Sequence, residues 1–317
     1  MRKENVGKSN ATENRSRVQG YHEHSFGSGV NYAFCGFSDN KYFTSDRYIK
    51  LDEHWNRADG KPLKGIGFEI ECECSAIHSD SVLATVLERD VFKCLPDGLF
   101  KLQSDGSLGG NSSAECITQV MTKEFIRNHY AGFKTLWERF NMYTITTENS
   151  NCGMHANLSL GLFGTSKKVQ DDCIRKLYYI INKHYNFFKV AFNRTNDTYY
   201  CRQMDYSIAK TMDLNSMPSA HSNALNYSHY VEGRIEIRLV GGQKNFPCFR
   251  NTCETIFHLI DAVKVLSWED CDDLAKIFSG CNSYVFDRIK DNCYRAGVIT
   301  MDDVNKIRDT VVNVHYL

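Results

Sequence analysis

The sequence predicts an α+β fold in which an antiparallel sheet packs against helices on one face. Two kinds of pattern predict it. Apolar and polar residues alternate over several short stretches, which is the period of a half-buried strand. Longer stretches carry apolar residues every three or four positions, which is the period of an amphipathic helix. Because there is no internal repeat and no clear linker, both kinds of element are expected in one domain of mixed type.

The stretch 65–74 shows the strand pattern best. Its apolar residues fall on one face, and Glu69, Glu71 and Glu73 fall on the other. Three carboxylates along one strand face repel one another unless a cation lies among them. A half-solvated strand with an acidic outer side explains the same pattern, so both interpretations stay open at this point.

Other stretches repeat the alternation. Strands are expected over 100–104 and 114–120, the second carrying Glu115, over 154–160, and over 227–231 paired with 234–240. The polar faces of 154–160 and 234–240 hold, respectively, His155, Asn157 and Ser159, and Arg234, Glu236 and Arg238.

Helical periodicity predicts the remaining elements. Helices are expected over about 80–94, 122–141, 167–190 and 245–266. Asp80 is a candidate N-cap for the first. Ser267–Asp270 and Thr300–Asp303 resemble capping boxes and predict two further helices near the C-terminus.

The N-terminal part is expected to differ from the rest. Residues 1–18 are polar and predict a disordered tail, and 19–64 are rich in aromatic residues without a sustained period, which predicts a loop-rich lead-in packed on the domain. His22 and His24 could ligate a metal, but a surface location is the more common role for such a pair. Residues 192–224 predict a long irregular loop.

Composition limits the function. The chain has 317 residues with 38 basic and 38 acidic side chains, so its near-zero net charge does not predict a nucleic-acid binder. No apolar run approaches the ~20 residues of a membrane span, and the N-terminus does not resemble a secretory signal. The 13 cysteines form no CxxC pair, which favours reduced, buried thiols in a cytoplasmic protein.

The polar strand faces suggest shared chemistry. If their apolar faces all pack on the helices, the polar faces line one concave side of the sheet. Carboxylates with a single imidazole suit Mg²⁺ or Mn²⁺, which prefer oxygen ligands. Guanidinium groups beside such cations suit phosphate. No Walker A loop or GxGxxG motif occurs, so a nucleotide would have to bind through this sheet.

Four motifs in this order carry a resemblance to a known family. They are Gly67–Glu71, Asp105–Ser107 followed by Glu115, Cys152–Asn157, and Arg234–Arg238. Together they resemble the amidoligases, which belong to the superfamily of carboxylate–amine ligases that includes glutamine synthetase and glutamate–cysteine ligase. The resemblance covers about 65–265. It implies that 65–317 form a catalytic domain whose sheet curls into a half-barrel.

The resemblance also implies cofactors and residue roles. ATP and two or three divalent ions would bind in the half-barrel. The implied metal ligands are Glu69, Glu71, Glu115, His155 and Glu236, with Glu69 and Glu71 on different ions. Arg238 would stabilise the γ-phosphate during transfer, and Asp105 would lie near the substrate or amine. Many relatives have a second histidine where this chain has Asn157, whose amide can hydrogen-bond a phosphate or ribose but is a poorer metal ligand.

The implied reaction is ATP-dependent formation of an amide or peptide-like bond through an acyl phosphate. The partners would be small-molecule or peptide carboxylates and amines, with no nucleic acid and no membrane. Homo-oligomers are left open, because glutamine synthetases form rings. Family members are frequent in phage genomes, which is compatible with a bacteriophage origin and a location in the host cytoplasm. The alternative is a catalytically inactive member that keeps the fold as a nucleotide- or protein-binding module.

Overall fold

The computed structural model describes residues 22–26, 29–33, 41–45, 47–52, 56–103, 108, 112–148, 152–194, 200–215 and 222–311. The predicted tail over 1–18 and the candidate residue Asp105 lie outside these ranges. The described residues form two compact units. The first comprises those up to Lys61 with Gly65–Met154 and Lys244–Phe246, and the second comprises Pro62–Lys64, His155–Gln243 and those from Pro247 onward. The predicted domain boundaries stay a prediction.

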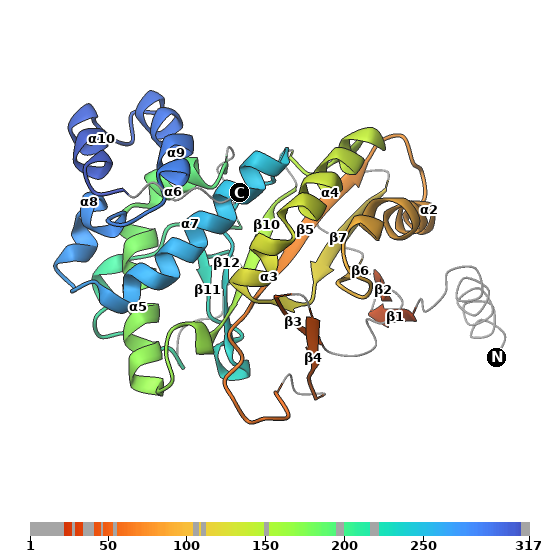
Figure 1. Cartoon of the computed structure of the whole chain (residues 1–317), viewed down its shortest axis with the longest axis horizontal. Coiled ribbons are helices and arrows are strands. Elements are labelled where there is room, and N and C mark those ends of the chain that lie inside the picture. Colours follow the sequence, from red (N-terminus) through yellow and green to blue (C-terminus); the bar gives the residue numbers. More distant parts are fainter. Residues whose placement is uncertain are drawn as a thin grey trace. The chain divides into compact units, whose positions relative to one another are not determined.

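The α+β class is confirmed by a largely antiparallel, open set of strands with packed helices (Figure 1). In the first unit, the strand order is β1-β2-β6-β7-β5, and each pair is antiparallel. These strands are β1 (His22–Phe26), β2 (Gly29–Ala33), β6 (Phe100–Gln103), β7 (Ser113–Thr118) and β5 (Ile66–Cys74). The strands predicted over 65–74, 100–104 and 114–120 are therefore confirmed.

Four short strands extend the first unit. They are β3 (Lys41–Thr44), β4 (Arg47–Lys50), β8 (Val120–Met121) and β9 (Ile145–Thr146). β3 pairs with β4 and, in parallel, with β8, whereas β8 and β9 each pair with β5. The strands β1 to β4 lie within the predicted lead-in, so this part of the chain is strand rather than loop. The aromatic residues Tyr42 and Phe43 of β3 are buried, which favours a paired strand over an exposed loop.

The helices of the first unit are α2 (Asp80–Val86), α3 (Lys123–Asn128) and α4 (Tyr130–Met142). After α2 the chain continues as a π-helical turn over Leu87–Val91 and a 3₁₀ turn over Phe92–Cys94. One helix was predicted over 122–141, but the structure has two, α3 and α4, separated at His129.

The predicted N-cap Asp80 is also wrong. The capping position is Ser79, and Asp80 is the first helical residue. Its carboxylate oxygen Oδ1 instead accepts a hydrogen bond from the backbone N–H of Ser113 at 3.2 Å. The side chain therefore ties α2 to the start of β7.

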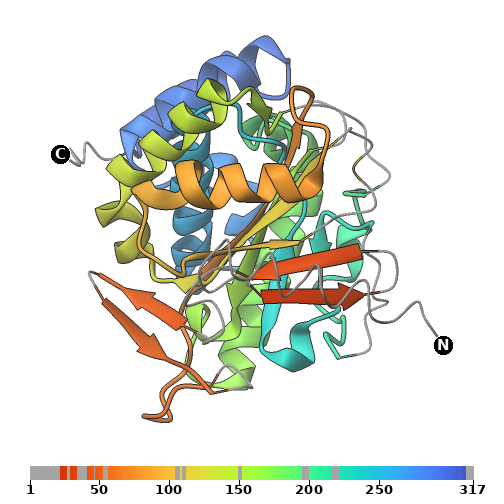
Figure 2. The ribbon, with the colours of Figure 1, turned by 90° about the vertical axis from the view of Figure 1, so that its right-hand side faces the viewer.

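The core of the first unit lies between β5 and the helices of its own unit. Phe68 and Ile70, on the apolar face of β5, are each 1% exposed. Leu83 of α2 and Leu136 of α4 are fully buried. Figure 2 shows α2 and the turns after it crossing in front of the strands of this unit, in agreement with its contacts to β7. The apolar faces predicted for β5 and α4 are confirmed.

Glu88, in the π-helical turn, makes stability depend on pH. Burial raises the pKa of this carboxyl to about 7, and Lys93 opposes the shift. The folded chain then holds a proton that the unfolded chain has already released, so stability is full below about pH 4.5 and falls as pH rises toward 7. Because Glu88 is only partly buried, solvent weakens the effect and we expect a loss of about 1 kcal/mol. Urea unfolding of Glu88→Gln should show higher stability than wild type at pH 8 and equal stability at pH 4. Equal stability at both pH values would contradict the shift.

The strands of the second unit have the order β10-β12-β11, and both pairs are antiparallel. They are β10 (Met154–Ser159), whose first residue belongs to the first unit, β12 (Arg234–Ile237) and β11 (Leu225–Asn226). The strand predicted over 227–231 is wrong, because residues Tyr230–Glu232 form a 3₁₀ turn. Gly233 ends this turn with φ of 92°, a backbone conformation that glycine adopts without steric strain.

The second unit contains more helix than strand. They are α5 (Lys167–Lys183), α6 (Tyr185–Ala191), α7 (Phe246–Val265), α8 (Leu274–Ile277), α9 (Ser283–Arg295) and α10 (Met301–Arg308). The helix predicted over 167–190 is interrupted at His184. The capping box at Thr300 is confirmed. Ser267 and Asp270 also bond reciprocally, but they open only a 3₁₀ turn over Asp270–Asp272.

Two compositional predictions can be checked. Every cysteine in the described ranges is a free thiol, and most are buried, as predicted. Cys72 and Cys116 lie in contact, with their sulfur atoms 3.8 Å apart, on neighbouring strands of the first unit. None of the described helices has the length and apolarity needed to cross a bilayer.

Candidate functional site

Carboxylates lie opposite each other on two strands of the first unit. Glu71 of β5 is directly paired with Glu115 of β7, and Glu69 pairs with Ile117. Side chains directly opposite on antiparallel strands have Cβ atoms about 5 Å apart, and like charges at this position are destabilising. Glu71 is 7% exposed, so water screens this repulsion poorly. The strand pairing therefore brings together two of the predicted metal ligands.

The Glu71 carboxylate has a backbone donor. Gly153 donates its N–H to Glu71 Oε2 at 2.5 Å, and the Glu71 N–H donates to the Gly153 carbonyl at 3.1 Å. This double contact holds the carboxylate against the turn that precedes β10. Gly153 lies only two residues before His155, so the motif Cys152–Asn157 begins at the acidic strand. Sequence reasoning missed this amide, because a backbone donor leaves no signal in residue type.

In the second unit, the strand register brings the polar residues of three strands into one array. Asn157 of β10, Glu236 of β12 and Asn226 of β11 are partners across the three strands. Ser159 pairs with Arg234 in the same way. Partners across antiparallel strands point to the same face, so the polar sets predicted for β10 and β12 share one face.

Glu236 is the centre of this array. Its oxygen Oε1 accepts a hydrogen bond from Arg238 Nη1 at 2.7 Å and lies 3.2 Å from His155 Nδ1. Its other oxygen, Oε2, accepts from Asn226 Nδ2 at 2.7 Å. Glu236 is 3% exposed, so a negative charge here depends on these three neighbours.

The contacts of Glu236 leave one of its carboxylate oxygens able to bind a further ligand. A carboxylate oxygen has about two acceptor positions. Oε1 accepts from Arg238 and lies close to His155 Nδ1, whereas Oε2 accepts from Asn226 alone among the described residues. A cation could therefore meet Glu236 through Oε2 without displacing these donors. When His155 Nδ1 carries the proton donated to Glu236, Nε2 is the nitrogen that can coordinate a metal.

The remaining predicted residues of this face are held by other contacts. Arg234 Nη1 donates to Asn157 Oδ1, and Ser159 Oγ donates to the Leu63 carbonyl at 2.9 Å. Asn157, which stands where many amidoligases have a histidine, therefore has a guanidinium partner. Arg238 differs from Arg234, because its Nε is shielded from water and has no hydrogen-bond partner within the described residues.

The donor set fits a hard divalent cation. Carboxylate oxygens and one imidazole nitrogen are ligands that Mg²⁺ and Mn²⁺ accept, and no described thiol belongs to the set. Glu71, His155 and Glu236 are buried, Glu69, Glu115 and Arg238 are partly exposed, and Asp105 is outside the described residues.

Asn226 is the functional candidate that sequence reasoning missed. It is 1% exposed and holds Glu236 through a side-chain hydrogen bond. The sequence shows no period here, because β11 has only two residues, Leu225 and Asn226, and the expected strand began after both of them, at 227. The true strand pairs Asn226 with Glu236.

Comparison with known proteins gives no independent assignment. No protein-family model matches the chain. No curated protein matches it either.

Proposed function

We propose that the chain is an ATP- and Mg²⁺-dependent carboxylate–amine ligase with a glutamine synthetase-like half-barrel. The observation that carries the proposal is the group of Glu236, His155 and Arg238, in which a buried carboxylate lies 3.2 Å from an imidazole nitrogen and 2.7 Å from a guanidinium nitrogen. Its residues belong to two of the four motifs that resemble the amidoligases. The paired Glu71 and Glu115 supply the carboxylates that the same motifs imply.

Two sets of side chains would hold the cations. The first unit would supply the carboxylates of Glu69, Glu71 and Glu115, and the second unit would supply the Glu236 carboxylate and the His155 imidazole. The cations would supply positive charge for the phosphate oxygens. The repulsion between Glu71 and Glu115 supports this assignment, because a bound cation would remove it.

The residues of the chain would act on ATP and the two substrates as follows. A carboxylate oxygen of the first substrate attacks the γ-phosphorus, the bond to ADP breaks, and an acyl phosphate forms. Arg238 faces this step as a fixed positive charge that stabilises the transferring phosphoryl group. The amine nitrogen then attacks the acyl carbon, inorganic phosphate leaves, and the amine loses a proton. Glu236 and Asn226 keep Arg238 and His155 in position.

A second candidate is a non-catalytic module that binds a nucleotide or a protein. One observation favours it: the Glu236 carboxylate already accepts hydrogen bonds from Arg238 and Asn226 and lies beside His155, and Asn157 accepts from Arg234, so Glu236 and Asn157 have protein partners without a ligand. This module would bind ATP without any dependence on the acidic strands.

A Mn²⁺ titration followed by electron paramagnetic resonance separates the two candidates. Glu69→Gln should weaken Mn²⁺ binding about 10- to 100-fold, because it replaces a charged ligand by a neutral amide. The matched control is Glu138→Gln on α4, whose side chain is 61% exposed and forms a surface salt bridge with Lys134. Thermal unfolding of each variant checks that the fold is intact. Equal Mn²⁺ affinity in the two variants would rule out the metal assignment and favour the binding module.

A further inference from the structure

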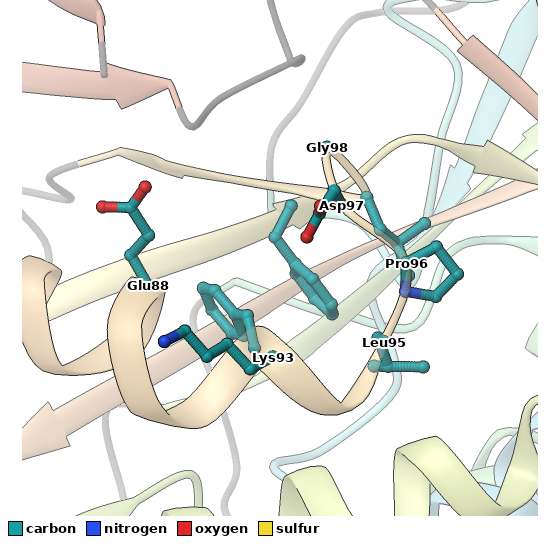
Figure 3. A pocket seen from close by; sticks show the side chains of 9 residues that line it. Glu88, Lys93, Leu95, Pro96, Asp97 and Gly98 are labelled. Carbon is teal, nitrogen blue, oxygen red and sulfur yellow. The ribbon is translucent and has the colours of Figure 1, made fainter. Parts of the chain in front are cut away.

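A surface cavity in the first unit lies apart from the polar faces of the strands. It follows α2, between the π-helical turn and the start of β6, and has a volume of about 70 Å³. Its lining includes Glu88, Phe92, Lys93, Leu95, Asp97 and Phe100. Figure 3 shows Glu88 and Lys93 reaching out from the helical side and Asp97 from the turn beside Gly98. The volume holds about five waters, or a ligand with about as many non-hydrogen atoms.

The backbone under Glu88 departs from α-helical geometry. Residues Leu87–Val91 form the π-helical turn, and Arg139 of α4 donates from Nη1 to the carbonyls of Asp90, at 2.6 Å, and Val91, at 3.3 Å. Arg139 thus stabilises a turn that an ordinary helix would not contain. π-Helical turns are rare and frequently lie at functional sites, because they change the direction of a side chain.

Glu88 contributes an unsatisfied acceptor to the cavity. Its oxygen Oε2 is shielded from water and has no hydrogen-bond partner within the described residues. Leaving such an oxygen unpaired is unfavourable, and an ionised carboxylate can only accept hydrogen bonds. The group that fits this position is therefore an N–H or O–H donor. A cationic donor fits best, because Glu88 and Asp97 outnumber the single cation, Lys93, in the lining.

The apolar part of the lining favours a hydrocarbon group in the ligand. The rings of Phe92 and Phe100 stack with centroids 4.3 Å apart and planes 6° from parallel. Stacked rings offer a flat apolar wall for a hydrocarbon group and a negative face for a nearby cation. A ligand that satisfies both parts of the lining carries a positive charge at one end and a short hydrocarbon body.

We propose that this cavity binds a small primary ammonium ion, with its N–H groups on Glu88 and its hydrocarbon body against Phe92 and Phe100. The site does not depend on the ligase assignment. The raised pKa of Glu88, at about 7 through burial, agrees with it, because the carboxylate lacks a partner that compensates its charge fully. Lys93 and Asp97 in the lining, Arg89 and Asp90 in the same turn and Arg139 of α4 are the charged groups around it.

The probe for this site is n-propylammonium, with propionate as the probe of opposite charge. Backbone amide NMR of the full chain at pH 8, read at Gly98, should show saturable binding of n-propylammonium with a Kd on the order of 1 mM. Glu88→Gln should weaken this binding about tenfold, because the charge-assisted hydrogen bond is lost. Lys93→Met should strengthen it, because the ammonium that competes for Glu88 is removed. Glu138→Gln should leave it unchanged.

Three results would overturn the proposal. The first is propionate binding at Gly98 more tightly than n-propylammonium. The second is an n-propylammonium affinity that is the same in wild type and Glu88→Gln, with both variants folded by thermal unfolding. The third is a Gly98 signal that shifts linearly without saturation well beyond the expected Kd. Because none of these readouts uses ATP or a divalent metal, failure here leaves the proposed ligase function unaffected.

Discussion

Replacing Arg238 by Met is expected to lower ATP turnover about a hundredfold, the effect of losing a fixed charge that stabilises a transition state. Arg238 is anchored by Glu236 at 2.7 Å while its Nε has no hydrogen-bond partner among the described residues, so the guanidinium can both hold its position and donate a hydrogen bond to a phosphoryl oxygen. The measurement is ADP released from Mg²⁺ and ATP in the presence of a mixed pool of amino acids, which supplies carboxylates and amines.

Arg234→Met is the matched control for this experiment. Arg234 lies four residues earlier, at the start of β12, but its guanidinium is bound to Asn157. We expect its loss to change turnover only severalfold, because it holds a neighbouring side chain rather than the γ-phosphate. An equal loss in the two variants would show that the face needs positive charge in general, and the specific role of Arg238 would be wrong.

Replacing Glu236 by Ala is expected to lower the free energy of unfolding by about 3–5 kcal/mol, the usual effect of removing one partner of a buried ion pair. The Arg238 side chain is only 13% exposed, and Asn226 is 1% exposed, so neither can turn to water for a replacement acceptor. Urea unfolding at pH 7 measures the loss. Glu232→Ala is the control, because the Glu232 side chain is 59% exposed. Among the described residues its one salt bridge is with His229.

A double variant tests the cause of this instability. Adding Arg238→Met to Glu236→Ala removes the uncompensated cation, so we expect the double variant to recover part of the lost stability. A double variant that is less stable than Glu236→Ala by the full effect of Arg238→Met alone would show that the two side chains are not coupled. The observed 2.7 Å contact would then contribute little to folding.

The sequence predicted the strands best where their alternation was longest. β5 and β10 each lie within one residue of their predicted bounds, because their apolar residues are buried at every second position. β11 was predicted too late, because only two of its residues pair with β12 and the 3₁₀ turn at Tyr230 follows at once. Two residues are too few for a period to show.

Helix ends and side-chain contacts were harder to predict. The interruptions at His129 and His184 carry no glycine or proline, and the apolar period continues through both, so the sequence gives no local signal for them. In the candidate site, the four motifs named Glu71, Glu115, His155 and Glu236, whose role as metal ligands stays a prediction. They could not predict Asn226 or the Gly153 amide, because those contacts depend on strand register.

Metal-dependent nucleotide binding by the unmodified chain is the most direct test of the proposed function. Isothermal titration with a non-hydrolysable ATP analogue should show binding in the presence of Mg²⁺ or Mn²⁺ and little or none after EDTA removes the divalent ions. The same affinity with and without divalent ions, or no binding under either condition, would contradict the account of Glu69, Glu71, Glu115, His155 and Glu236 as ligands of cations that hold ATP.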